Sequence, residues 1–202
     1  MTRAILIGLP GSGKDTVGSI LSEDTGIPLI SLGDLLRSYL KGKWRKALDR
    51  GDFIPDEIIY RILTKKTSGL KSYILNGFPR KLNQAENLER LGGIDEVFFL
   101  DITVRESIKR LSNRYVCPSC DFVSKKDGLC GNCGDKLTKR KDDAPEVVKK
   151  RIKLYKKETI PVLEFYRERK KLFTIKGRNS MAIAKKIEKI IKENTKIKRR
   201  SR

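Results

Sequence analysis

The chain has 202 residues, 38% of them hydrophobic, and its 46 lysines and arginines outnumber its 25 acidic residues to give a formal net charge of +21. A chain of this length can bury about 70% of the surface that its unfolded form exposes, so we expect one main domain with one core. No segment approaches the roughly 20 consecutive apolar residues of a membrane helix, and residues 1–16 lack the pattern of a signal peptide. We therefore expect a cytoplasmic protein without membrane contacts, whose charge favours anionic partners such as nucleotides or nucleic acid.

Short apolar runs alternate with helical patterns along most of the chain. The first run, residues 4–7, ends at Gly8, and the apolar residues after it are spaced as on a helix until Thr25 and Gly26. Because short strands that alternate with helices form parallel sheets covered on both faces, we predict an α/β fold. Further runs that predict buried strands lie at residues 28–30, 73–75, 97–100 and 172–175.

Two segments interrupt this alternation. Residues 34–67 contain helical patterns but no strand pattern, which predicts a helical insert. Residues 115–143 are rich in turn formers and hold all four cysteines, which predicts a small flap held by a metal ion. The helical stretch at residues 145–171 contains Pro161, which should break or kink it because proline lacks a backbone N–H group. We expect the basic residues 193–202 to form a disordered tail.

The segment from Gly8 to Thr16 joins the first predicted strand to the first predicted helix. Glycines let backbone N–H groups curl around phosphate oxygens, the helix N-terminus adds partial positive charge, and a lysine adds a full charge. The sequence GLPGSGKDT has these features and therefore predicts a phosphate-binding loop. In the general pattern Ser or Thr follows the lysine directly, whereas here Asp15 comes before Thr16. The residues that we expect at the phosphates are Gly11, Ser12, Gly13, Lys14, Asp15 and Thr16.

With its hydroxyl residue displaced by one position, this loop resembles that of the adenylate kinases, which usually have glycine in the place of Asp15. Other motifs that resemble the family follow in order along the chain, and together they cover about residues 3–192. They are ISLGDLLR at residues 30–37, NGFPR at residues 76–80 with Gln84, then Arg110 and Arg114, then RKDD at residues 140–143, and Arg151.

The resemblance implies a P-loop NTPase-type fold, a doubly wound parallel sheet with two inserts. Its core would be residues 1–33, 68–114 and 144–192, with a helical insert that binds nucleoside monophosphate (NMP) at residues 34–67 and a zinc-binding lid at residues 115–143. Residues 193–202 would be a basic tail outside this core. The implied reaction is reversible phosphoryl transfer from Mg-ATP to AMP, which gives two ADP.

Such a reaction needs little covalent chemistry from the protein, but it needs groups that position the phosphates and neutralise their charge. Arginine suits this work because its planar group grips two phosphate oxygens and stays charged. By resemblance, Arg37 and Arg80 hold the AMP phosphate, Arg114, Arg140 and Arg151 close on the transferred group, Arg110 stacks on the ATP base, and Lys14 bridges the donor phosphates. Leu32, Ile54 and Gly77 are further nucleotide contacts that the resemblance implies.

Two adjacent carboxylates have two possible roles. Asp142 and Asp143 can orient the arginines of the lid when it closes, as the resemblance implies. They can also cap the helix that we expect to begin near Ala144, because aspartate accepts hydrogen bonds from free N–H groups at a helix start.

The identity of the acceptor depends on Gln84 and Leu32. A glutamine amide has both a donor and an acceptor, so Gln84 can pair with the amino and ring-nitrogen edge of adenine, as the equivalent residue does in adenylate kinases. Pyrimidine-selective relatives usually carry asparagine there. Leu32 stands where adenylate kinases typically have a hydroxyl residue, which favours the alternative of a UMP/CMP kinase.

Two C-x2-C pairs predict a metal site. Each pair can place two thiolates on one tetrahedral ion, and four sulfur ligands close the coordination shell, so we expect structural Zn²⁺ rather than a catalytic ion. Because a cytoplasmic setting keeps thiols reduced, disulfide bonds are not expected. The predicted ligands are Cys117, Cys120, Cys130 and Cys133.

The predicted magnesium site departs from the family pattern. Adenylate kinases usually have aspartate in the position of Asn76, where a carboxylate holds waters of Mg²⁺. Asp34 remains in place here, and Asp15 adds a second acid beside the phosphate loop. Two interpretations of Asp15 stay open, either that it compensates for the neutral Asn76 or that it only complements the first turn of its helix.

An alternative from another functional class is a zinc-ribbon protein that binds nucleic acid. The net charge of +21, the cysteine pairs and the basic tail favour it, but it leaves the phosphate loop and the ordered arginines unexplained. We therefore expect an enzyme with ATP and AMP as substrates, in which nucleic-acid binding is compatible but not required. We expect a monomer.

Overall fold

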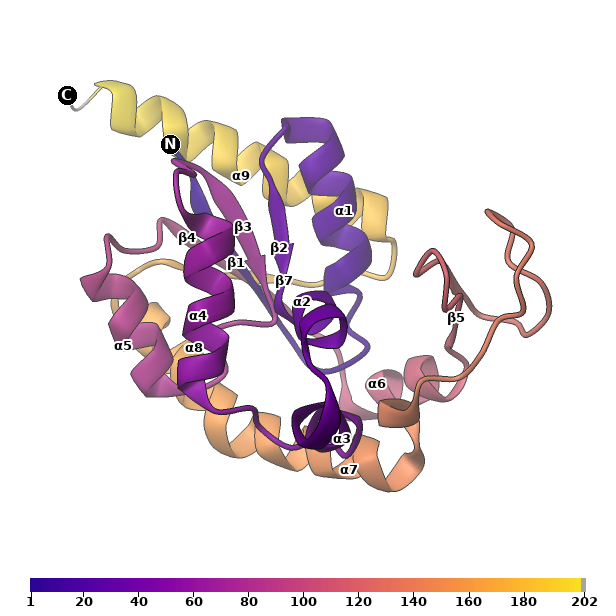
Figure 1. The fold of residues 1–202 in the computed structure, drawn as a ribbon. Coiled ribbons are helices and arrows are strands. Elements are labelled where there is room, and N and C mark those ends of the chain that lie inside the picture. The colour runs from indigo at the N-terminus through magenta and orange to yellow at the C-terminus, as the bar shows by residue number, and fades with distance from the viewer. Residues whose placement is uncertain (201–202) are drawn as a thin grey trace.

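The computed structural model describes the backbone of residues 1–200 and the side chains of residues 1–197. A five-stranded sheet with the strand order β2-β3-β1-β4-β7 lies at its centre, and every pairing in this sheet is parallel (Figure 1). The strands are β1 Arg3–Ile7, β2 Leu29–Ser31, β3 Tyr73–Asn76, β4 Glu96–Leu100 and β7 Leu172–Ile175. All five predicted strands are thereby confirmed, as is the α/β fold class.

Helices cover both faces of the sheet because alternate residues of its strands point to opposite sides. Ala4 and Leu6 of β1 pack in one cluster with α1 (Lys14–Thr25) and α9 (Ser180–Arg200). Ile5 and Ile7 pack in the cluster on the other face with α5 (Leu82–Arg90) and α8 (Ile160–Glu168). The central strand is therefore apolar and buried from Ala4 to Ile7, as strands covered on both faces are.

Three helices lie between β2 and β3, and the described residues of this segment contain no strand. They are α2 Leu32–Tyr39, α3 Gly42–Asp49 and α4 Asp56–Thr67. Their apolar residues, among them Leu36 and Leu63, join the same cluster as α5 and α8, so the segment packs against the body of the protein.

The segment after α6 (Val104–Ser112) projects from this body (Figure 1). It contains the two short antiparallel strands β5 Tyr115–Val116 and β6 Val123–Ser124 and returns through the 3-10 helix η1 Lys141–Asp143 to α7 Pro145–Leu154. Its small apolar cluster includes Cys117, Cys130 and Leu137.

The expected break at Pro161 is confirmed. A π-helical turn, η2 Tyr155–Thr159, separates α7 from α8, and Pro161 lies in the first turn of α8. Proline has no N–H group to donate to the preceding turn, and the wider π turn accommodates this gap without ending the helical path.

The structure corrects the prediction of a disordered tail from residue 193 onward. Helix α9 continues to Arg200, while residues 201–202 lie outside the described residues. The buried residues Ile183, Ile187 and Ile191 form a stripe at helical spacing that packs against α1. No proline or glycine follows them to end the helix, so the basic residues continue it.

None of the helices formed by the described residues combines the length and the apolar character needed to cross a membrane.

Candidate active site

The loop between β1 and α1 forms a cradle at the carboxyl edge of the sheet. Gly13 has a φ of 91° and precedes the first helical residue, a conformation that glycine adopts without strain. A Cβ atom on Gly8 would lie 2.6 Å from the Ser12 hydroxyl oxygen and 2.7 Å from the Leu100 carbonyl oxygen. The two glycines therefore permit a tight turn that ends in the N-terminus of α1, which is an anion-binding geometry.

Lys14 folds back over this cradle. Its Nζ donates hydrogen bonds to the carbonyl oxygens of Gly8 at 2.9 Å and Leu9 at 3.0 Å and to the Ser12 hydroxyl at 3.2 Å. Burial, opposed by the nearby Asp15 carboxylate and assisted by neighbouring arginines, lowers the pKa of Lys14 to about 8. Burial thus disfavours the protonated form of Lys14, and a phosphate group bound next to it would stabilise that form. Ser12 is buried, and Thr16 is exposed in the first turn of α1.

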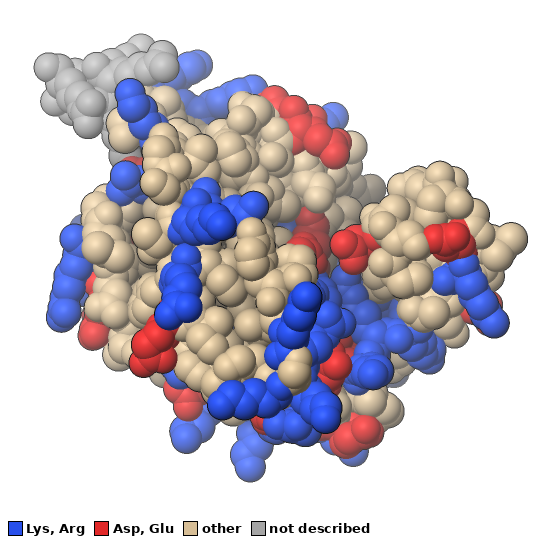
Figure 2. Space-filling view, in the orientation of Figure 1, with Lys and Arg blue, Asp and Glu red and all other residues tan. Residues whose placement is uncertain are grey.

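A cavity beside the loop collects cationic side chains from distant parts of the chain. Figure 2 shows lysines and arginines gathered on the face between the α3 region and the projecting segment. The cavity is bordered by Gly11, Gly77, Asp15 and Asp142 as well as by this cationic set. The six cations that line it are Lys14, Arg37 from α2, Arg80 after β3, Arg114 after α6, Arg140 before η1 and Arg151 from α7.

Burial and the closeness of these positive charges lower the pKa values of several of the arginines. Burial, together with Arg151 and Arg37, lowers the pKa of Arg80 to about 10. Burial is also the main cause that lowers the pKa values of Arg140 and Arg151, and other arginines add to it. Like charges at short range disfavour one another, so the cavity is prepared for an anion that would balance them.

Two carboxylates hold part of this arginine set. Asp143, which is 8% exposed, accepts two hydrogen bonds from Arg114, at 2.8 Å from Nε and 2.7 Å from Nη2. Arg151 Nη1 lies 2.9 Å from Asp142 Oδ2. Helix α7 has Ala144 at its N-cap and no side-chain cap, so ion pairing and not helix capping is what these two acids do in this structure.

Arg37 and Arg80 follow the carboxyl ends of β2 and β3, and local contacts orient their side chains. Arg37 forms a salt bridge with Asp34 one helical turn earlier. Arg80 Nε donates to the Gly77 carbonyl oxygen at 2.8 Å. Leu32 and Ile54, in contrast, are buried in the main apolar cluster and do not line this cavity.

The side-chain amide of Gln84 forms hydrogen bonds within the protein. Its Oε1 accepts the backbone N–H groups of Arg80 at 2.8 Å and Lys81 at 3.3 Å, and its Nε2 donates to Asp56 Oδ1 at 2.7 Å. In this arrangement the amide oxygen caps the start of α5, and the amide N–H side of Gln84 faces the Asp56 carboxylate. Sequence reasoning missed Asp56, whose only local signal is Pro55 before it at a helix start.

Arg110 lies outside the cavity, next to the phosphate loop. Its Nε donates to Glu106 Oε1 at 2.8 Å and its Nη1 to the Ser12 carbonyl oxygen at 3.4 Å. The predicted stacking of Arg110 on the ATP base stays a prediction.

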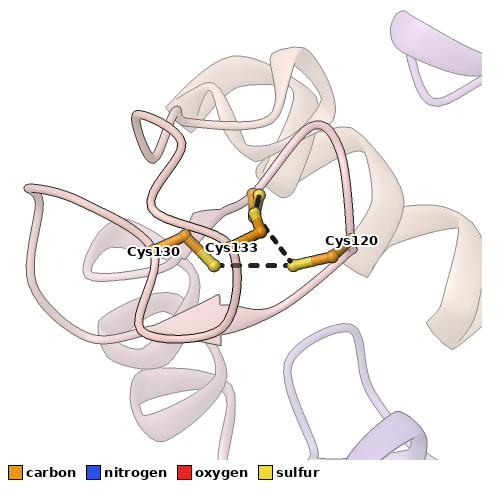
Figure 3. A group of neighbouring side chains, drawn as sticks. Cys120, Cys130 and Cys133 are labelled. Atoms are coloured by element: carbon orange, nitrogen blue, oxygen red, sulfur yellow. Dashed lines mark hydrogen bonds between the residues drawn. The ribbon is translucent and has the colours of Figure 1, made fainter.

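The four cysteines come together in the projecting segment, and all of them are free thiols. Figure 3 shows the sulfur atoms of Cys120, Cys130 and Cys133 turned toward one another. Their Sγ atoms and that of Cys117 all lie within 4.8 Å of one another, with the shortest separations at 3.4, 3.5 and 3.6 Å. A tetrahedral ion with bonds of about 2.3 Å separates its sulfur ligands by about 3.8 Å, so four thiolates in this arrangement fit such an ion.

A phosphate loop at the carboxyl edge of a parallel sheet, next to a cavity of arginines, defines a phosphotransferase of the P-loop class.

Comparison with known proteins gives the family. The adenylate kinase family model matches residues 6–171. Relatives named adenylate kinase include one from Petrotoga mobilis, 39% identical with 95% of this chain and 94% of the relative covered. Others come from Dehalococcoides mccartyi (36% identical, 95% and 99% covered) and Thermosipho africanus (36% identical, 97% and 99% covered). The chain belongs to the adenylate kinase family, whose members are nucleoside monophosphate kinases that use ATP and Mg²⁺.

The lowered pKa of Lys14 predicts that ATP affinity depends on pH. Below about pH 8 the free site holds a protonated lysine that attracts phosphate, and above it the lysine must first take up a proton. The dissociation constant for ATP should therefore rise by up to about tenfold per pH unit above this value, as measured by calorimetric titration between pH 7 and 10. Lys14→Gln should bind ATP more weakly and with a flat pH profile. An equally steep profile in that variant would assign the titration to another group.

Proposed function

We propose that this enzyme transfers the γ-phosphoryl group of Mg-ATP reversibly to AMP, giving two ADP. The observation that carries the proposal is the set of six cationic side chains lining one cavity beside the phosphate loop. Two nucleotides that meet end to end bring many negative charges together, and such a cavity is suited to neutralise them.

Each cation has a proposed place along the line of phosphates. The loop N–H groups and Lys14 hold the donor phosphates at the N-terminus of α1. Arg37 and Arg80, next to the carboxyl ends of β2 and β3, hold the phosphate of AMP. Arg114, Arg140 and Arg151 surround the group in transit, where charge spreads over its equatorial oxygens. Bound Mg²⁺ would supply further neutralisation of the donor phosphates.

The two inserts would close over the nucleotides. We assign residues 34–67 to an NMP-binding insert, residues 115–143 to a lid, and residues 1–33, 68–114 and 144–192 to the core. Support comes from the cavity itself, which receives Arg37 and Asp52 from the first insert and Arg140 and Asp142 from the second. Closure would exclude water that otherwise accepts the phosphoryl group and would bring the lid arginines to the reacting atoms.

Base recognition would be shared by Gln84 and Asp56. The free N–H of the Gln84 amide can donate to the ring nitrogen of adenine, and the Asp56 carboxylate can accept from its amino group. Uracil and guanine present the opposite pattern and would leave buried polar groups unpaired. Cytosine presents the same edge as adenine on a smaller ring, so a UMP/CMP kinase is the remaining candidate within the class.

AMP should be the best acceptor when AMP, CMP, UMP and GMP are offered separately with ATP in a coupled assay. UMP and GMP should be rejected by about 10⁴-fold in kcat/KM because a hydrogen-bonding site discriminates strongly against a mismatched edge. CMP should be the second substrate. Equal catalytic efficiency with CMP and AMP would contradict the assignment of AMP as the acceptor.

Arg80→Ala should lower turnover by about 10³-fold or more, because the half-buried guanidinium lines the cavity and contributes charge stabilisation that water cannot replace. The control is Arg90→Ala at the exposed end of α5, which should keep turnover within about twofold. Steady-state kinetics at saturating AMP and ATP distinguish the two. A loss below tenfold for Arg80→Ala would show that this arginine does not contact the reacting phosphates.

The four-cysteine site would hold structural Zn²⁺, because four thiolates leave no open position for a substrate. A monomer suffices for this chemistry, and nucleic acid is not needed for it.

Purified protein should contain one zinc ion per chain by mass spectrometry of its metals. Chelation should increase hydrogen exchange in residues 115–140 while the strands of the sheet stay protected, since the ion closes only the projecting segment. Cys120→Ser should lose the metal, whereas Ser119→Ala in the same turn should keep it. Reduced protein without zinc and with four reactive thiols would exclude the site.

A further inference from the structure

Three carboxylates line the phosphate cavity, and two of them are paired with cations. Asp52 forms salt bridges with Lys150 and with Arg50, the latter at 3.1 Å, and Asp142 pairs with Arg151 at 2.9 Å. Asp15 forms no salt bridge among the described residues. Its Oδ1 instead accepts a hydrogen bond from the neutral amide of Asn76 at 2.5 Å.

Asn76 is a fixed platform for this contact. It is the last residue of β3, is 2% exposed, and is held between Leu6 of β1 and Ser31 of β2 in the register of the sheet. Its Nδ2 donates to Asp15 from a strand that cannot shift without disturbing the core. The bond therefore fixes the direction of the carboxylate without itself adding a countercharge.

The carboxylate stays ionised next to the loop. Asp15 is exposed at the cavity, and desolvation by its neighbours acts to raise its pKa, but the Lys14 charge and the Asn76 hydrogen bond outweigh this effect and hold the pKa below its ordinary value. A fixed negative charge beside the phosphate loop repels the phosphates of a nucleotide. Complementing the first turn of α1 does not remove that repulsion, because the phosphates compete for the same helix N-terminus.

A divalent cation between the carboxylate and the phosphates attracts both anionic groups and so offsets their mutual repulsion. Mg²⁺ prefers oxygen ligands, keeps several waters, and is usually bound by one or two carboxylates together with substrate phosphates. Asp15 has the chemistry and the position for this role, and the two other carboxylates of the cavity are already paired with cations.

We infer that Asp15 is the carboxylate that holds the Mg²⁺ of bound Mg-ATP and that Asn76 is the positioning residue that orients it. The inference rests on the proposed use of Mg-ATP and adds to it the source of the protein's anionic contact. Asp15 and Asn76 then act together. Asp15 supplies the negative charge from α1, and Asn76 supplies the hydrogen-bond donor from the end of β3.

The test compares ATP binding with and without the metal. The dissociation constant of ATP is measured by calorimetry in excess EDTA and again in excess Mg²⁺. The ratio of the EDTA value to the Mg²⁺ value gives the gain in affinity that the metal provides. In Asp15→Asn this ratio should fall by about 10- to 100-fold, because metal-free ATP no longer meets a repelling charge and Mg-ATP loses a contact. If the variant binds ATP in excess EDTA, its nucleotide site is folded.

Matched variants separate a specific contact from general loss of charge. Asp52→Asn removes the same charge from the same cavity and should leave the ratio within about threefold of that of the native protein. Exchanging the two residues, by Asp15→Asn together with Asn76→Asp, restores a carboxylate bonded to an amide and should restore the ratio. Mn²⁺ titrated in the presence of ATP and followed by electron paramagnetic resonance should rank the variants in the same order.

The inference is overturned by an unchanged ratio in Asp15→Asn, by an equal fall in Asp52→Asn, or by an exchanged pair that binds like the single variant. The phosphorylation of AMP by the native protein is tested separately. If the native protein phosphorylates AMP but the ratio is unchanged in Asp15→Asn, only the assignment of Asp15 fails. If the native protein does not phosphorylate AMP, the proposed function fails whatever the variants do.

Discussion

Six cationic side chains converge on one cavity, and their mutual repulsion must be balanced by the fold or by a ligand. The lowered pKa values of Lys14, Arg80, Arg140 and Arg151 record that repulsion together with the cost of burial. Asp142 and Asp143 balance part of it through Arg114 and Arg151. Among the described residues, the remaining positive charge forms no salt bridge with a carboxylate that lines the cavity and would be neutralised by bound phosphate groups, whereas a structural ion-pair network is neutralised within the protein.

The parallel sheet makes this concentration of charge possible. β1 lies between β3 and β4, and its apolar residues are buried on both faces, so the position of the loop that follows it is fixed by the core. The same edge carries the ends of β2 and β3, which bring Arg37 and Arg80 to the loop from other parts of the chain. The burial of apolar surface thereby supplies the free energy that holds like charges close together.

Residues 34–67 and 115–143, called the first and second inserts here because they interrupt the alternation of strands and helices, both contribute side chains to the cavity. Asp52, in the loop after α3, pairs with Lys150 of α7, and a Cβ atom on Gly51 would lie 3.0 Å from the side chain of Arg151. Glycine at this place lets the first insert approach the helix that carries an arginine of the site. The position of that insert and the position of Arg151 are therefore coupled through direct contact.

Elements with local signals are predictable from the sequence alone. The apolar runs identify all five strands of the sheet, the glycines before Lys14 identify the loop, and the spacing of the cysteine pairs identifies the cluster that the fold assembles. These patterns are local because strand burial, phosphate cradling and metal ligation each depend on residues a few positions apart. The end of the last helix was not predicted, because the basic composition after Ile191 favoured a tail, whereas α9 is packed against α1 through Ile187 and Ile191 and continues to Arg200.

The pairing of polar side chains, in contrast, depends on contacts between distant parts of the chain. The contact of Asp15 with Asn76 joins residues 61 positions apart, that of Gln84 with Asp56 joins residues 28 apart, and that of Arg114 with Asp143 joins residues 29 apart. Periodicity predicts which face of an element is apolar, but it contains no information on which polar group meets which across the fold. That choice follows from the register of the sheet and the packing of its helices, which fix the distances over which hydrogen bonds and charges act.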